Sequence, residues 1–203
     1  MGNFQFKALG IPGLTLVECR AFEDNRGGFM ETWQAEEFTK AGLPAFVQEN
    51  QSISAKGVVR GLHFQRKHPQ GKLVRAVLGE VFDVAVDLRQ DSPAFGRWRG
   101  VILSGANRRQ LYIPPGCAHG FMALSEKAVF AYKCTDYYHP EEEDGILWND
   151  PDLAIAWPDH GTVVLSDRDR TRPAWREYLR REGERKRKEG KVGQFAGGHR
   201  PQD

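Results

Sequence analysis

Residues 114–120 of the chain, Pro114-Pro115-Gly116-Cys117-Ala118-His119-Gly120, place a proline–glycine turn just before a histidine. Proline fixes its own φ angle and glycine tolerates positive φ, so a tight turn is expected here. The flanking runs, Gln110–Ile113 and Gly120–Leu124, are short and mostly apolar, as β-strands are. The stretch therefore predicts two strands joined by a tight turn, with His119 close to a strand end.

The same pattern of short β-branched or aromatic runs, separated by Gly, Pro, Asn or Asp, recurs along the chain. The other predicted strands are Leu14–Arg20, Gly28–Trp33, Val47–Ser54, Leu73–Leu78, Val81–Leu88, Arg97–Ser104 and Val129–Thr135. Helical periodicity is confined to Ala35–Ala41 and Ala174–Arg181. Many short antiparallel strands without alternating long helices favour a β-sandwich or jelly roll over a Rossmann-type sheet.

Within the run Val81–Leu88, polar and apolar residues alternate, and Asp83 and Asp87 fall on one face. Such alternation is typical of a strand with one side in water. We therefore expect these two aspartates to be solvent-exposed.

The length of 203 residues suits one domain, which we place at residues 1–182. Residues 183–203 form a basic tail that we expect to be a fraying helix followed by a flexible end. The tail has Phe195 but no other aromatic residue, so a nucleic-acid role is not expected. No run of about 18 apolar residues occurs, so no membrane span is expected. The odd count and spacing of Cys19, Cys117 and Cys134 suggest reduced thiols and a cytoplasmic protein.

Polar residues stand out near the expected strand ends, in Arg60–Gln65 and Gly71–Leu73. Two cations, Arg60 and Lys72, lie close to His63 in the sequence. Burying both cations in the interior of a jelly roll costs free energy unless an anion binds there. Cations beside an imidazole favour its neutral form, which can act as a general base near pH 7.

The P-x-G-x-x-H segment resembles the second motif of the cupin superfamily, whose members are jelly rolls. In metal-binding cupins the first motif supplies H-x-H and then a glutamate. Here His63 is followed by Gln65, and Pro69 and Gln70 stand near the glutamate position. Two imidazoles are too few ligands to hold a cation against water, so we expect no metal and no other cofactor.

A closer resemblance, from about Gly13 to Asp169, is to the dTDP-4-dehydrorhamnose 3,5-epimerase family. It rests on these segments in order: Asp24–Glu31, Gln48–Ser52, Gly57–Gln65, Gln70–Val74, Asp83–Arg89, the P-x-G-x-x-H segment, Ala131–Lys133 and Trp148–Pro151. The resemblance implies a mainly β, cupin-type jelly roll with a few short helices, mostly near the C-terminus. It also implies a homodimeric isomerase that acts on a dTDP-linked 4-keto-6-deoxy sugar, in dTDP-L-rhamnose biosynthesis.

By this resemblance, His63 is the base that removes a proton next to the C4 ketone, and Asp169 is its carboxylate partner. Lys72 would stabilise the enolate oxygen, and Tyr132 would return a proton from the opposite face. Substrate contacts are expected from a larger set: Arg26, Phe29, Glu31, Gln48, Asn50, Arg60, His119, Tyr138, Glu143 and Arg168. The segment with Arg26, Phe29 and Glu31 would reach the site of a neighbouring subunit.

Several alternatives stay open at the sequence level. Arg168 stands where the family commonly has lysine, and Glu143 with Arg168 could be no more than a solvated ion pair. Relatives that epimerise only carbon 3 or only carbon 5 use the same base and acid, so a single-position epimerase is the main rival. A catalytically silent sugar-nucleotide-binding cupin would have no need of His63, Asp169 and Tyr132 together. A metal-dependent cupin would need the missing ligands.

Overall fold

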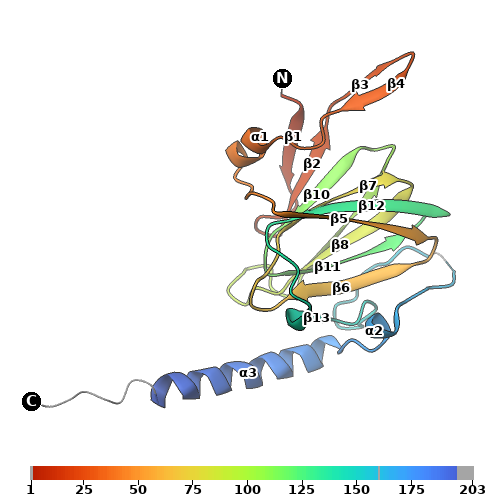
Figure 1. Ribbon diagram of the computed structural model, residues 1–203. Helices are drawn as coiled ribbons and strands as arrows, with labels where there is room; N and C mark the ends of the chain where they lie inside the picture. Colours follow the sequence, from red (N-terminus) through yellow and green to blue (C-terminus); the bar gives the residue numbers. More distant parts are fainter. Residues whose placement is uncertain (1, 160, 196–203) are drawn as a thin grey trace, which may run out of the picture.

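Two antiparallel sheets face each other and form a sandwich in the computed structural model, which describes residues 2–159 and 161–195. The six-stranded sheet has the order β1 (Phe4–Ala8), β2 (Thr15–Cys19), β10 (Arg109–Ile113), β7 (Lys72–Leu78), β12 (Lys127–Cys134), β5 (Gln48–Ala55). The five-stranded sheet has the order β13 (Glu143–Gly145), β6 (Val59–Gln65), β11 (Cys117–Ala123), β8 (Glu80–Asp87), β9 (Trp98–Ser104). Strands distant in sequence are neighbours in both sheets, which confirms the expected jelly-roll architecture (Figure 1).

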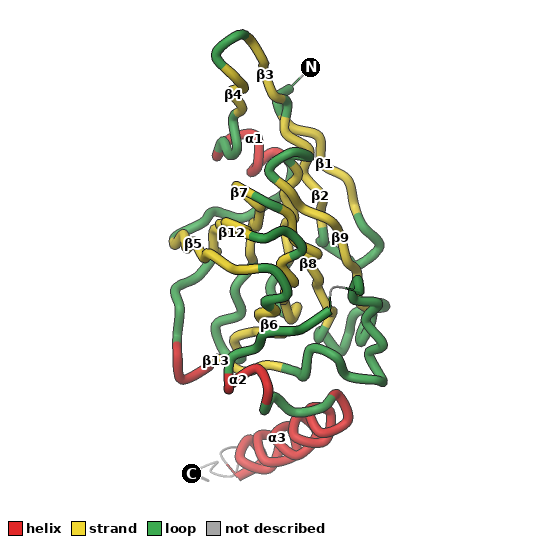
Figure 2. Tube along the Cα trace, turned by 90° about the vertical axis from the view of Figure 1, so that its right-hand side faces the viewer, coloured by secondary structure: helices red, strands yellow, loops and turns green. Residues whose placement is uncertain are grey.

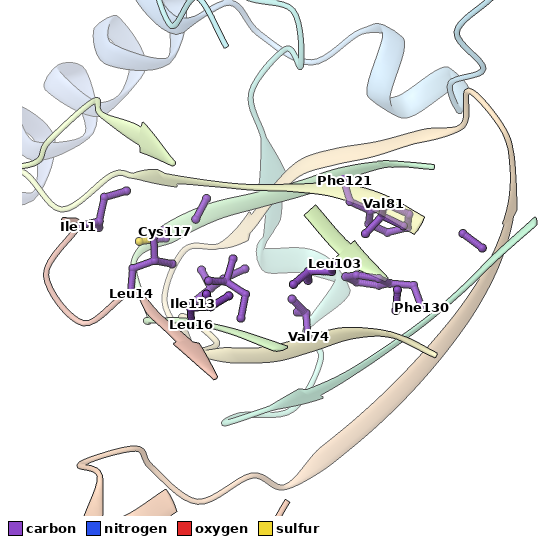
Figure 3. Close-up of a cluster of buried hydrophobic side chains, with 14 of the residues drawn as sticks. Ile11, Leu14, Leu16, Val74, Val81, Leu103, Ile113, Cys117, Phe121 and Phe130 are labelled. Atoms are coloured by element: carbon purple, nitrogen blue, oxygen red, sulfur yellow. The ribbon is translucent and has the colours of Figure 1, made fainter. Parts of the chain in front are cut away.

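The main hydrophobic core fills the space between the sheets (Figure 3). Val74 of the six-stranded sheet and Val81 and Leu103 of the five-stranded sheet are fully buried in it. Phe130 stacks on Phe121 with ring centroids 4.3 Å apart, so an aromatic pair joins β12 to β11. The alternation of apolar residues along each strand produces this layer, because every second side chain points to the opposite face.

A hairpin and a helix lie at opposite ends of the molecule. The strands β3 (Ala21–Asp24) and β4 (Gly27–Met30) pair only with each other and project away from the sandwich (Figures 1 and 2). The helix α1 (Ala35–Lys40) packs Phe38 against Phe4 of β1, near the base of this hairpin. At the other end, α3 (Trp175–Phe195) lies below the five-stranded sheet (Figure 2).

The structure contains all nine of the strands that the sequence predicted. His119 lies close to a strand end as expected, because it is the third residue of β11. Arg60–Gln65 were expected near strand ends, but they make up most of β6, a strand that was not predicted. Asp83 and Asp87 were expected in water, but both are fully buried. The alternation was correct, but this polar face points inward, where Asp83 bonds His119 and Asp87 bonds Arg89 and Ser92.

The C-terminal helix is longer than its apolar pattern predicts. It continues to Phe195. Its first turns are held by the buried Tyr178 and Glu182, and ion pairs such as Arg181–Glu177 support their exposed side. The end of the basic tail, residues 196–203, lies outside the described residues. None of the helices within the described ranges combines the length and the apolar character that a membrane crossing requires.

The two faces of β9 offer a matched test of the core. Leu103→Ala removes a fully buried side chain and should lower the free energy of unfolding by about 2–5 kcal/mol. Ile102→Ala, on the opposite and more exposed face, should cost about 1 kcal/mol or less. Urea denaturation of both variants measures the difference, and equal losses would contradict the assignment of the core.

Candidate active site

A histidine and an aspartate from distant parts of the chain form the centre of the site. His63 of β6 bonds through Nε2 to Oδ1 of Asp169, at 2.5 Å. Asp169 lies on the short helix α2 (Asp167–Arg170), and its backbone N–H donates to the N-capping Ser166 at 3.1 Å. Burial by itself would raise the pKa of Asp169, but the hydrogen bond and charge of His63 hold that pKa below its usual value. The carboxylate therefore stays ionised and can stabilise the imidazolium form of His63.

A lysine and a tyrosine face this pair from the other sheet. Lys72 begins β7, Tyr132 lies on β12, and the lysine Nζ is 5.9 Å from the centre of the tyrosine ring. Burial lowers the pKa of Lys72, an effect opposed by the nearby charges of Asp83 and Glu143. Burial also raises the pKa of Tyr132, so its phenol keeps its proton. The base and the phenol thus belong to opposite walls of the sandwich.

The second histidine has a carboxylate partner of its own. His119 of β11 lies directly opposite His63 in the strand register and bonds through Nε2 to Oδ2 of Asp83, at 2.9 Å. Asp83 is fully buried, and its Oδ1 has no hydrogen-bond partner among the described residues. The sequence analysis did not propose Asp83 as a site residue. Its alternation with buried neighbours was the available signal, and it was assigned to a wet face instead.

A cavity of about 500 Å³ lies between the sheets, and it is lined by His63, Asp169, Lys72, Tyr132 and His119. His63, Lys72, Tyr132 and Glu143 also line an adjoining cavity of about 320 Å³. The adjoining cavity is completed by Gln48, Asn50 and Tyr138, three of the residues expected to contact substrate. Together the two spaces are large enough for a small organic ligand that extends past the histidine.

Glu143 of β13 connects several side chains at the junction of the two cavities. It accepts a hydrogen bond from the Tyr138 hydroxyl at 2.6 Å and from Nη2 of Arg172 at 2.7 Å, and Arg168 lies 3.1 Å away. Burial opposes its ionisation, but these partners hold the pKa of Glu143 below its usual value. The bond to Glu143 raises the pKa of Tyr138. Glu143 and Arg168 therefore do form an ion pair, and both also line the cavity with His63.

The remaining expected binding residues divide into two groups. Arg60 lines the main cavity at its rim, where its Nε donates to Ser54 at 3.1 Å. Arg26, Phe29 and Glu31 lie on or beside the projecting hairpin, and none is among the described residues that line the two cavities. Arg26 pairs with Asp24 of its own hairpin, and Phe29 is 72% exposed.

The position that supplies a ligand in metal-binding cupins has a structural role here. The Gln65 side chain donates to the carbonyls of His68 and Tyr137 and accepts from the backbone of His139. In residues 2–159 and 161–195, no group of three or more His, Cys, Asp or Glu side chains is placed to hold a metal ion. The site therefore combines a general base (His63) bonded to a carboxylate, a nearby cation (Lys72) and a phenol on the opposite wall (Tyr132). This set suits proton transfer at a carbon next to a carbonyl group.

Comparisons with known proteins agree with this geometry. The model of a family described as dTDP-4-dehydrorhamnose 3,5-epimerase matches residues 8–177. A Pseudomonas aeruginosa protein named dTDP-4-dehydrorhamnose 3,5-epimerase is 56% identical over 164 residues, which are 80% of this chain and 91% of that protein.

Among solved structures, a dTDP-6-deoxy-D-glucose-3,5-epimerase from Legionella pneumophila, in complex with dTDP-4-keto-L-rhamnose, is 51% identical with a TM-score of 0.82. The match covers 84% of this chain and 92% of that one. A 3'-monoepimerase from Streptomyces bikiniensis, in complex with dTDP-quinovose, is 35% identical with a TM-score of 0.78, covering 82% of this chain and 85% of that one.

The bond between His63 and the buried Asp169 predicts a pH-dependent contribution to stability. Because the pKa of Asp169 is lowered by folding, its stabilisation is present above the unfolded pKa of about 3.9 and is lost as the pH falls through the lower folded value. Asp169→Asn should therefore lower the free energy of unfolding by about 1–3 kcal/mol at pH 7. The difference from the wild-type protein should shrink below about pH 4.

Asp167→Asn, at an exposed carboxylate on the same helix, provides the control and should have little effect at either pH. Urea denaturation from pH 3 to pH 8 measures both variants. A deficit in Asp169→Asn that did not change with pH would contradict an ionised carboxylate.

Proposed function

The chain belongs to the dTDP-4-dehydrorhamnose 3,5-epimerase family, and from this premise we propose how its own residues carry out the reaction. The protein is an isomerase that converts dTDP-4-dehydro-6-deoxy-D-glucose into dTDP-4-dehydro-L-rhamnose, in dTDP-L-rhamnose biosynthesis. Both carbons that invert flank the C4 ketone, so their protons are acidic enough for a side-chain base to remove. The observation that carries the proposal is the pairing of His63 with Asp169 opposite Lys72 and Tyr132.

In the proposed mechanism, His63 removes the proton from the carbon next to the ketone, and Asp169 stabilises the imidazolium that forms. The ammonium group of Lys72 offsets the negative charge that develops on the ketone oxygen, in the manner of an oxyanion-hole donor. Tyr132 gives a proton to the opposite face of the same carbon. Since His63 and Tyr132 come from different sheets, removal and return of the proton on opposite faces inverts the centre.

We propose that the nucleotide end of the substrate lies in the smaller cavity. Tyr138 supplies an aromatic surface for the thymine, while Gln48 and Asn50 supply hydrogen-bonding groups. Arg60 and Arg168, exposed at the rim of the main cavity, supply positive charge for the diphosphate. His119 lines the sugar site, where Asp83 fixes its orientation.

A homodimer would complete this site. The projecting hairpin carries Arg26, Phe29 and, just beyond it, Glu31, and these residues have no role in the cavities of their own chain. The outward face of the six-stranded sheet also exposes a row of apolar side chains, with Ile53 59% and Leu78 52% exposed on either side of Val129. Exposed apolar rows of this kind mark interaction surfaces. We propose that this face packs on a second copy, so that each hairpin reaches the partner's site.

We also propose that the protein works in the cytoplasm. Cys19, Cys117 and Cys134 are all unpaired, which suits a reducing compartment. The division into a domain at residues 1–182 and a basic tail at 183–203 is likewise a proposal. The family match supports it because that match ends at residue 177.

A single-position epimerase is the second candidate, because a 3'-monoepimerase shares this fold at 35% identity. Incubation with dTDP-4-keto-6-deoxyglucose in D₂O separates the two. The wild-type protein should incorporate deuterium at carbons 3 and 5, with the epimerised ketone trapped by a reductase, whereas label at one carbon would show a single-position enzyme. NMR or mass spectrometry of the sugar measures the label, and no label at all would contradict both candidates.

His63→Ala in the same assay should lower turnover by about 10²–10⁴-fold or more, while dTDP affinity stays within a few-fold. Tyr132→Phe should impair net inversion more than proton exchange at the first carbon, since only the return of the proton is affected. Turnover at the wild-type rate in His63→Ala would remove this residue from the mechanism. Equal losses of exchange and inversion in Tyr132→Phe would contradict an acid on the opposite face.

The dimer is tested by Ile53→Glu, which places a charge in the proposed interface and should raise the dimer dissociation constant at least ~10-fold. Leu179→Glu changes an exposed apolar residue of α3 and serves as the control. Analytical ultracentrifugation measures both. A wild-type protein that sediments as a monomer, or an Ile53→Glu protein as dimeric as the wild type, would contradict this interface.

A further inference from the structure

Arg172, in the segment that follows α2, is a buried cation for which the reaction scheme above gives no role. Its side chain is only 10% exposed, and it lines the main cavity together with His63. An arginine removed from water in this way is costly unless its charge is used by neighbouring groups.

The guanidinium lies between carboxylates from two different elements. Nη2 donates to Glu143 of β13 at 2.7 Å, and Nη1 lies 3.8 Å from Asp144 of the same strand. Nε lies 3.9 Å from Oδ1 of Asp169 on α2, the same oxygen that bonds His63. This Nε is buried and has no hydrogen-bond partner among the described residues. Its charge therefore acts on Asp169 across a short gap rather than through a direct bond.

The neighbouring strand is shaped to let Arg172 approach. Gly145 of β13 pairs with His63 in the strand register. A Cβ atom at position 145 would lie 2.7 Å from Nε of Arg172 and 2.6 Å from the carbonyl oxygen of Leu62. Since both distances are shorter than contacts that real Cβ atoms make, only glycine lets the guanidinium come this close to the strand pair that carries His63.

The charges around His63 define what Arg172 contributes. Asp169 and Glu143 face His63 as anions, and both favour its protonated form. The other charged or titratable groups that line the cavity are Arg60 on β6, Lys72 on β7, His119 on β11, Tyr132 on β12 and Arg168 on α2. Asp83 on β8 is bonded to His119. Asp144 on β13 is shared with Arg66, the residue after β6, which also pairs with Glu182 of α3. Of the cations, Arg172 is the one that lies against both anions that face His63.

We propose that Arg172 is a positioning residue, which aligns Asp169 and Glu143 and balances their charge so that His63 remains an unprotonated base at neutral pH. The inference rests on the proposed function, because it assigns His63 the role of base. It differs from that proposal by adding a residue that acts through its neighbours and makes no contact with the reacting carbon.

The test is the pH dependence of α-proton exchange in D₂O, measured as kcat/KM for Arg172→Gln and Arg172→Lys. Without the positive charge of Arg172, the negative charges of Asp169 and Glu143 are less well neutralised. A proton therefore binds His63 more readily. The acid limb of Arg172→Gln should therefore move to higher pH by roughly 0.5–1 unit. Its rate at neutral pH should fall by about 3–10-fold, and the loss should become smaller on the alkaline plateau. Arg172→Lys keeps the charge and should restore most of the acid limb.

Arg176→Gln is the matched control, since it removes the same charge from an arginine that is 83% exposed and four residues further along. Its acid limb should coincide with that of the wild type. Melting temperatures of all variants separate a folding defect from the pH effect, because a merely structural role would lower the rate equally at every pH.

Two outcomes would overturn the proposal. One is an unmoved acid limb in a folded Arg172→Gln protein, and the other is a rise in KM alone, which would make Arg172 a substrate contact. If the wild-type protein itself exchanged no deuterium, the proposed function would fail first, so the two failures are distinguishable.

Discussion

A hydrogen bond between His63 and Asp169 joins residues 106 positions apart, and the organisation of the site depends on it. One partner is fixed by the pairing of β6 with β11 and β13, and the other by the capped turn of α2. Neither element alone holds a base in a defined orientation. The chain between β13 and α2 must therefore bring Asp169 back to β6 before its carboxylate can reach the imidazole of His63.

The region around this pair brings charges of both signs together. Lys72 and Arg172 on one side and Asp83, Glu143 and Asp169 on the other are each costly to bury singly. Burial acts against their charged forms, but neighbouring groups hold the pKa values of Glu143 and Asp169 below their usual values and oppose the lowering of the Lys72 pKa. A carbanion-forming reaction benefits from such an arrangement, since charge develops where fixed groups already face it.

Two surfaces of the chain are exposed in a way that the proposed dimer would account for. The hairpin β3–β4 carries aromatic and charged side chains away from the body, and the outward row around Ile53 exposes apolar area. A second copy of the chain that covers the six-stranded sheet and contacts the hairpin would account for both the exposed hairpin and the exposed apolar row. The same arrangement would explain why residues with a strong sequence resemblance to substrate contacts lie outside the cavities of their own chain.

Periodicity and turn residues by themselves determined the β class and the positions of most strands, because alternation is a local property of the chain. The resemblance added His63, Lys72, Tyr132 and the residues of the smaller cavity, and the structure places these side by side. Local pattern could not tell whether the polar face of Val81–Leu88 meets water or the buried interior, so the prediction for Asp83 was wrong. Nor could local pattern reveal Arg172, because its proposed role depends on carboxylates that lie on two other elements, Glu143 and Asp169. Only tertiary packing decides such contacts, because burial and long-range pairing determine which charges share a low-dielectric space.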